Sequence, residues 1–157
     1  MVDRYSGWPF ICKLKKTSTD AVTSQIMEWF HDFGIAKIIR SDGGPQFRNT
    51  FNEFCEQHNI KHELSSPYNA PSNGHAEAAV KSMKYLLTKC DGIWGKFRPA
   101  LHEWRNTPRA DGISPAQLMF GRRQRTTLPV LNKAYNTVEG ERNLPVTKEK
   151  KIWQNFP

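Results

Sequence analysis

The sequence predicts an α/β fold followed by an all-helical flank, and three observations support this. Short apolar and β-branched runs alternate with segments of helical periodicity over the first 65 residues. From about residue 73 onward, helical patterns dominate. A chain of 157 residues is long enough for about one domain with a substantial core. Strands that alternate with helices are typical of layered α/β proteins.

Strand and helix signals follow one another in the first part of the chain. Residues 2–15 (VDRYSGWPFICKLK) are aromatic and β-branched but broken by Ser-Gly and Pro, so we expect a bent strand or a strand pair. Start signals at residues 17–20 and a stop at Gly34 bound the next helix. Its apolar residues recur at helical spacing: Val22, Ile26, Trp29, Phe30 and Phe33. AKIIRSD (36–42) is expected to be a short strand.

Helical patterns govern most of the remaining body. A second helix is predicted by four residues at helical spacing: Phe47, Phe51, Phe54 and Cys55. KHELSS (61–66) is expected to be a third extended run. Further helices are expected at roughly 73–90, 96–105 and 114–120, the last of them capped by Ser114 and Pro115.

The composition limits the classes of partner. No stretch approaches the ~18 uninterrupted apolar residues of a membrane span. The first ten residues lack the profile of a signal peptide. Three cysteines without framework spacing favour a reducing compartment. A net charge of +8 favours a polyanionic partner, and we expect no membrane partner.

The positive charge is concentrated near the C-terminus. Residues 122–157 contain eight Lys or Arg and three Glu, whereas the other 121 residues contain fifteen basic and twelve acidic residues. The segment is polar and punctuated by proline, so we interpret it as a connector or arm with at most short strands. A solvated tail is an equally open interpretation.

Asp42 closes an apolar strand and is followed by two glycines. A carboxylate at a strand end, with no side chains beside it, can approach a metal ion or a phosphate closely. Asp-Gly-Gly is also an ordinary turn sequence, so Asp42 alone does not decide between a turn and a site.

Glu77 lies in the first turn of the helix expected at 73–90. At about 100° per residue, Glu77 falls within about 60° of Lys81, Lys84 and Thr88, opposite the apolar side of the helix. A Glu–Lys pair four residues apart is common and contributes only ~0.2–0.5 kcal/mol, and helix geometry alone favours that interpretation.

Asp42 and Glu77, 35 residues apart, together suggest a different role. Mg²⁺ prefers oxygen ligands and is usually held by one or two carboxylates with water and substrate phosphates. Two such ions would promote phosphoryl transfer, provided that the carboxylates converge from different elements.

A second possible metal motif is Cys55-x-x-His58-x-x-x-His62, which has plausible zinc spacing. Cys55 belongs to the apolar stripe of its helix, and no fourth ligand is evident. We therefore do not interpret these residues as a zinc site.

Four segments carry a family resemblance: VDRYSGWPFICKL, IIRSDGGPQFRNTFNEFC, HELSSPYNAPSNGHAEAAVKSMKYLL and WRNTPRADGISPAQLMFGRR. In this order they resemble the catalytic core of integrases from retroviruses and, more closely, from gypsy-type LTR retrotransposons. They cover most of residues 2–123. The resemblance implies a ribonuclease-H-like fold, with an integrase catalytic core over residues 1–121 and a basic linker or tail over residues 122–157.

The resemblance also implies roles for four of these side chains. The family has a D,D-35-E triad of carboxylates that binds Mg²⁺ or Mn²⁺ in a two-metal site. Asp42 matches the second acid and Glu77 the third, and their separation agrees. Lys81 and Lys84 match positions at which retroviral relatives hold viral DNA.

In the family, the loop before the glutamate helix lies against the DNA ends. Here that loop is Tyr68 to Gly74, with Asn73 and Gly74 at the helix entrance. The resemblance therefore implies that Tyr68, Asn73 and Gly74 contact DNA. Relatives usually have Pro-Gln where this chain has Ala70-Pro71, so the local turn is expected to differ.

The function implied by the resemblance is DNA integration, in which retroelement ends are processed and joined to target DNA. The family further implies a homo-oligomer and action in the nucleus, although the sequence contains no targeting signal that we identify. A hypothesis from a different class is a non-catalytic nucleic-acid-binding or assembly module that keeps the fold without the chemistry.

One departure concerns the first acid of the triad. The Tyr-Ser-Gly-Trp context aligns residues 2–8 with the second strand of the family, so we expect Asp3 to be an ordinary strand residue and the first strand and first aspartate to be missing. Two carboxylates would leave the two-metal site incomplete. The absent central strand would expose unpaired backbone groups, so we expect the isolated chain to be poorly folded or aggregation-prone, and catalytically silent.

Overall fold

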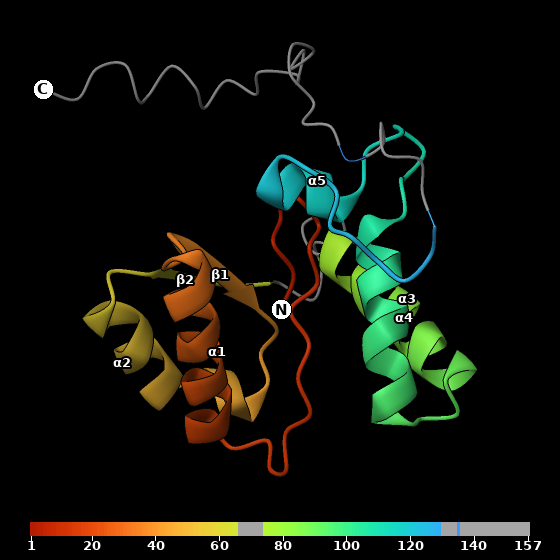
Figure 1. The fold of residues 1–157 in the computed structure, drawn as a ribbon. Coiled ribbons are helices and arrows are strands. Elements are labelled where there is room, and N and C mark those ends of the chain that lie inside the picture. Colours follow the sequence, from red (N-terminus) through yellow and green to blue (C-terminus); the bar gives the residue numbers. More distant parts are fainter. Residues whose placement is uncertain (66–73, 130–134, 136–157) are drawn as a thin grey trace, which may run out of the picture. The chain divides into compact units, whose positions relative to one another are not determined.

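The computed structural model describes residues 1–65, 74–129 and 135 (Figure 1). The chain divides into two compact units, residues 1–89 and residues 90–157. The described part of the first unit contains three α-helices and a parallel pair of strands, and that of the second contains two α-helices. Within the described residues, no helix is both long enough and apolar enough to cross a bilayer.

The N-terminal segment forms a tight antiparallel turn. The Asp3 N–H donates to the Trp8 carbonyl at 2.9 Å, and Val2 and Pro9 form an isolated bridge. No strand forms over residues 2–15, so the strand pair that we expected there is reduced to this bridge and its turn. Pro9 has no N–H with which to continue a ladder.

The carboxylate of Asp3 holds this turn together. Its Oδ2 accepts the Ser6 N–H at 2.7 Å and the Ser6 hydroxyl at 2.6 Å. The Ser6 hydroxyl oxygen in turn accepts the Trp8 N–H at 3.1 Å, and Ser6 is fully buried. Asp3 therefore has a structural role in the N-terminal turn.

Helix α1 spans Thr19–Phe33 and begins and ends at the expected signals. The hydroxyl of Ser18, its N-cap, accepts the Ala21 N–H at 3.4 Å. At the other end, Gly34 adopts a φ of 88° and donates its N–H to the Phe30 carbonyl at 2.8 Å. A positive φ of this kind is easily adopted only by glycine, which explains why the helix ends there.

Strands β1 (Ile38–Ser41) and β2 (Lys61–Leu64) form where their sequences predicted extended runs, and they pair in parallel. Helix α2 (Thr50–Gln57) lies between them in sequence and provides the crossover that a parallel pair requires. A 3₁₀ turn, η1 (Pro45–Phe47), precedes it. Phe47 was expected in the second helix and belongs to this turn instead, because Pro45 starts a separate short element there.

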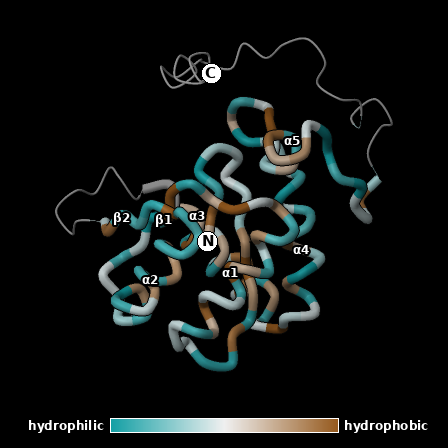
Figure 2. Tube along the Cα trace, turned by 90° about the vertical axis from the view of Figure 1, so that its left-hand side faces the viewer, coloured by the Kyte–Doolittle hydropathy of each residue, from teal (hydrophilic) through white to brown (hydrophobic). Residues whose placement is uncertain are grey.

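One face of the sheet is buried by the first two helices. Its core combines residues from α1, β1, α2 and the loop before β2: Ile26, Phe30, Ile39, Phe51, Cys55 and Ile60. Phe51 of α2 is fully buried, and its ring centroid lies 5.1 Å from that of Phe47 and 4.9 Å from that of His62. Along α1, hydrophobic and hydrophilic residues alternate every few positions, as expected for a helix with one buried face (Figure 2).

The other face of the sheet carries charges. Arg40 lies directly opposite Glu63, and its Nε is 2.5 Å from Oε2 of Glu63. Lys61 Nζ lies 2.9 Å from the second carboxylate oxygen. Hydrogen bonds from Lys61 and Arg40 hold the pKa of Glu63 below its ordinary value. These opposite charges support the observed register of the two strands.

In the second unit, helix α4 spans Trp94–Asn106 and helix α5 spans Pro115–Phe120. The expected cap of α5 is confirmed. Ser114 Oγ accepts the Gln117 N–H at 3.3 Å, and Gln117 Oε1 accepts the Ser114 N–H at 3.0 Å. This reciprocal pair is a capping box, and Pro at the first helical position completes it.

The chain after α5 is bound along α4. Asn106 Oδ1 accepts the Gln124 N–H at 2.8 Å, and Glu103 Oε1 accepts the N–H and the hydroxyl of Thr127 at 3.2 and 3.0 Å. Burial alone would raise the pKa of Glu103, but hydrogen bonds from Thr126 and Thr127 outweigh it and lower the pKa. The start of the expected tail is thus attached to the helical unit, and most of the tail lies outside the described residues.

Candidate functional site

Asp42 is the first residue after β1, as the sequence predicted. Its side chain is exposed, and its Oδ1 accepts the Gly44 N–H at 3.1 Å. This bond orients the carboxylate over its own loop and leaves Oδ2 free of any hydrogen bond that the structure defines. An exposed carboxylate of this kind can accept a cation or a phosphate-bound metal.

The loop after Asp42 is held by a side chain that sequence reasoning did not single out. Arg48 donates from Nε and Nη2 to the Gly43 carbonyl at 3.2 and 3.0 Å. Gly44 is tightly enclosed, because a Cβ atom there would lie 2.7 Å from Gln46 Nε2 and 3.0 Å from Asp42 Oδ1. The glycine therefore makes room for the carboxylate of Asp42.

Glu77 lies in the first turn of helix α3, which spans Gly74–Lys89. The side chains of Glu77, Lys81 and Lys84 are all exposed, whereas Met83 is buried. The polar side is exposed as its sequence predicted, whereas the apolar side is only partly buried, since Val80 is half exposed.

The remaining predicted DNA contacts fall at or before the start of this helix. Gly74 is the first residue of α3. Tyr68 and Asn73 lie outside the described residues.

The donor chemistry of Asp42 and Glu77 fits a hard divalent cation, since both offer exposed carboxylate oxygens. Over residues 1–65 and 74–129, no three His, Cys, Asp or Glu side chains form a group that would hold a metal ion. The pairing of Asp42 with Glu77 at one metal site remains a prediction from the sequence.

The three side chains of the zinc-like motif are bound to different partners. Cys55 is in the core, and burial raises the pKa of its thiol. His58 Nδ1 lies 2.8 Å from the Phe54 carbonyl oxygen of its own helix. His62 contacts two polar side chains instead, and these contacts connect it to β1.

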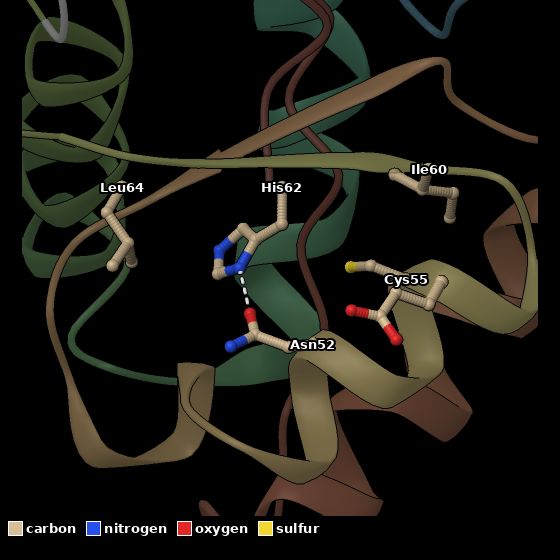
Figure 3. Close-up of a pocket in the computed structure, with 6 residues that line it drawn as sticks. Asn52, Cys55, Ile60, His62 and Leu64 are labelled. Carbon is tan, nitrogen blue, oxygen red and sulfur yellow. Dashed lines mark hydrogen bonds between the residues drawn. The ribbon is translucent and has the colours of Figure 1, made fainter.

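His62 lies on β2 and points toward α2, where it joins a chain of polar contacts (Figure 3). Its Nδ1 is 2.6 Å from Oδ1 of Asn52, and its Nε2 is 2.8 Å from Oγ of Ser41. Ser41 is the residue immediately before Asp42. Burial lowers the pKa of His62 below its ordinary value of 6.5, so the imidazole is neutral near pH 7.

A cavity of about 340 Å³ lies beside His62, between β2 and α2. Its lining combines polar and apolar side chains: Asn52, Cys55, Glu56, Ile60, His62 and Leu64. Sequence reasoning considered His62 only as part of the zinc-like motif. Its link to Ser41 depends on strand register, for which the sequence carries no local signal.

Comparison with known proteins shows which proteins this chain resembles. Residues 1–70 match the model of the integrase core domain. An uncharacterized protein of Caenorhabditis elegans is 35% identical over 130 residues, and the Gag-Pol polyprotein of avian reticuloendotheliosis virus is 30% identical over 131 residues. These alignments cover 76% and 77% of this chain but only 10% and 11% of the relatives, so the chain spans a small part of their length.

Solved structures show the same fold. A simian T-cell lymphotropic virus intasome in complex with PP2A regulatory subunit B56 gamma matches with a TM-score of 0.68 and 22% identity, over 83% of this chain and 50% of that chain. The HTLV-2 integrase catalytic core domain in complex with magnesium, in its trimeric form, matches with a TM-score of 0.60 and 24% identity, over 75% of this chain and 80% of that chain. The expected α/β fold of an integrase catalytic core, which is ribonuclease-H-like, is thereby confirmed.

Proposed function

We propose that this chain, which contains an integrase core domain homologous to parts of retroviral Pol polyproteins, takes part in DNA integration by polynucleotidyl transfer. The observation that carries the proposal lies inside the matched region. Asp42 stands directly after β1 with an exposed carboxylate, in a loop held by Arg48 and shaped around Gly44. Function at this site requires a carboxylate that is ordered and accessible at the same time.

In this proposal, Asp42 and Glu77 bind Mg²⁺ or Mn²⁺ through their carboxylate oxygens. The bound metal supplies activation of the attacking oxygen and stabilisation of the leaving oxygen. Lys81 and Lys84 bind phosphates and so position the DNA without reading its sequence. Tyr68, Asn73 and Gly74 belong to the segment that contacts the DNA end.

The partners that we propose are retroelement DNA ends, target DNA and further copies of this chain. The intasome and the trimeric core among the similar structures support an assembly of several copies. We further propose that the protein acts in the nucleus, where target DNA is found.

The catalytic role is tested by a strand-transfer assay with Asp42→Asn and Glu77→Gln in the 157-residue chain. If the wild-type chain joins DNA ends, we expect each substitution to abolish that joining, while DNA affinity, measured by fluorescence anisotropy, stays within about twofold, because neither residue binds phosphate directly. If the wild-type chain binds DNA but joins none with either metal, the non-catalytic binding or assembly module is the better description.

The phosphate contacts are tested separately with Lys81→Gln and Lys84→Gln. Each lost phosphate contact should weaken DNA binding and reduce the slope of log affinity against log salt by about 0.9 for duplex DNA. Lys89→Gln is the matched control, since Lys89 is on the same helix but lies over the Tyr85 ring, 5.2 Å from its centroid. Equal effects of all three substitutions would contradict a specific role for Lys81 and Lys84.

A further inference from the structure

We infer that Asn52, His62 and Ser41 form a hydrogen-bonded relay that positions Asp42 for metal binding. This inference rests on the proposed function, because it assigns these three residues a role in supporting one of the proposed metal ligands. His62 and Asn52 are positioning residues and touch neither substrate nor metal in this assignment.

The relay crosses three elements in one continuous path. Asn52 on α2 lies 2.6 Å from His62 Nδ1, and His62 on β2 lies 2.8 Å from Ser41 Oγ on β1. Ser41 Oγ is also 3.0 Å from the Asp42 carbonyl oxygen. Helix α2 is therefore connected, through side chains alone, to the backbone of the candidate metal ligand. Figure 3 shows the first of these contacts, between α2 and β2.

The chemistry of the three side chains defines the direction of the relay. Asn52 Oδ1 can only accept, so Nδ1 of His62 carries the ring proton. In the neutral ring Nε2 is then an acceptor, as is the Asp42 carbonyl oxygen. The Ser41 hydroxyl has one proton, which it shares between these two acceptors in a bifurcated hydrogen bond. The ring of His62 is further held by Phe51, whose centroid is 4.9 Å away.

Ser41 is fixed by its backbone as well as by its side chain. Its carbonyl oxygen accepts the Ser65 N–H at 2.8 Å and the Ser65 hydroxyl at 3.0 Å. With both groups bound, Ser41 has little freedom, and the next residue, Asp42, leaves the strand in one direction. The Asp42 carboxylate then binds the Gly44 N–H at 3.1 Å.

A Ser–His–Asn arrangement also has the order of a nucleophile, its base and an orienting group. Ser41 is unsuited to nucleophilic attack, because the residue is only 7% exposed within the sheet. The hydroxyl is directed at His62 and the backbone of Asp42, so its role is to hold the end of β1.

The test compares two substitutions of His62, each of which can keep only one of the two side-chain hydrogen bonds of the ring. In His62→Gln the side-chain amide reaches the place of Nε2 and can still bond Ser41, whereas in His62→Asn it reaches only the place of Nδ1. Ser41→Ala removes the same link from the other side. All variants are made in the full 157-residue chain.

Two readouts follow the position of Asp42 in ¹⁵N-labelled protein. We expect His62→Asn and Ser41→Ala to speed amide hydrogen exchange at Gly44 and to weaken Mg²⁺ binding on the order of tenfold, as outer partners of metal ligands commonly do. His62→Gln should retain most of both properties. Amides in the middle of α1 serve as the internal control and should not change.

Equal damage by His62→Asn and His62→Gln would overturn the relay, since it would show that His62 serves only packing. Unchanged Gly44 exchange in His62→Asn and Ser41→Ala would overturn it as well. If wild-type protein does not bind Mg²⁺, the proposed function loses its metal site, while the exchange data still decide whether the relay holds Asp42.

The wild-type protein offers a test that needs no substitution. The ¹⁵N shifts of the His62 ring should show a proton on Nδ1 and a bare Nε2 at pH 7.5. A proton on Nε2 instead would contradict the relay, even if every variant failed to fold.

Discussion

At the scale of single residues, His62 links folding to pH. Its pKa is lowered by burial in the folded chain, whereas in the unfolded chain it keeps its ordinary value of 6.5. Below about pH 6.5 the unfolded chain therefore binds more protons, and stability is lost as the pH falls toward the folded pKa. We therefore expect the urea concentration at the unfolding midpoint of the wild type to decrease when the pH is lowered from 7.5 to 5.5.

His62→Gln provides the control for this effect, because glutamine does not titrate. The fall in its midpoint over the same pH range should be smaller than in the wild type. The lowered pKa of Glu63 adds its own loss of stability, but only near and below its ordinary value of 4.5, outside this range. Identical pH dependence in both proteins would show that His62 does not contribute.

At the scale of elements, the two serine N-caps should contribute differently to the free energy of unfolding. Ser114 is fully buried in a reciprocal capping box, whereas Ser18 holds the start of α1 through a single bond of 3.4 Å. We expect Ser114→Ala to lower the free energy of unfolding by about 1–2 kcal/mol and Ser18→Ala to lower it less. Urea unfolding measures both values. A larger loss from Ser18→Ala would contradict the importance of the capping box.

The packing of α2 predicts a larger loss of stability than either cap substitution. Phe51 is fully buried among aromatic rings, so Phe51→Ala should cost about 3–5 kcal/mol. That is a large share of the ~5–15 kcal/mol typical of a domain. Tyr85→Ala is the control, because Tyr85 is 65% exposed, and its midpoint in urea should scarcely change. Similar losses from both substitutions would contradict the assigned core.

The elements also show how far the sequence alone could reach. Local signals sufficed for α1, whose cap and terminating Gly34 were both identified, and for α5 with its Ser-Pro start. They failed for residues 2–15, where β-forming residues are overruled by Pro9 and the turn around Asp3. The sequence also indicated Asp42 as the residue that closes its strand.

The support around Asp42 could not be predicted in the same way. The contact between Ser41 and His62 depends on the parallel register that sets Ser41 opposite Leu64. It also requires α2 to place Asn52 beside the ring. Both conditions are tertiary, so periodicity and motif spacing carry no signal for them.

At the scale of the whole molecule, the distribution of charge predicts how DNA is bound. Two triple substitutions to glutamine each lower the net charge from +8 to +5: Lys148, Lys150 and Lys151 in the tail, and Lys13, Lys15 and Lys16 near the N-terminus. If the tail is an arm that contacts DNA, the tail variant should lose more affinity and show a shallower salt dependence. Equal losses in anisotropy titrations would favour a merely solvated tail.

The close fit at Gly44 predicts which residue natural selection should retain at this position. Its φ of −58° suits any residue, so the fold would accept alanine once the flexible Gln46 side chain moved aside. The new methyl group would nevertheless press on the carboxylate of Asp42. Genes kept for chemistry should therefore retain glycine at this codon, whereas genes kept only for binding are free to drift there. The residue found at this codon in related genes would therefore distinguish selection for chemistry from selection for binding alone.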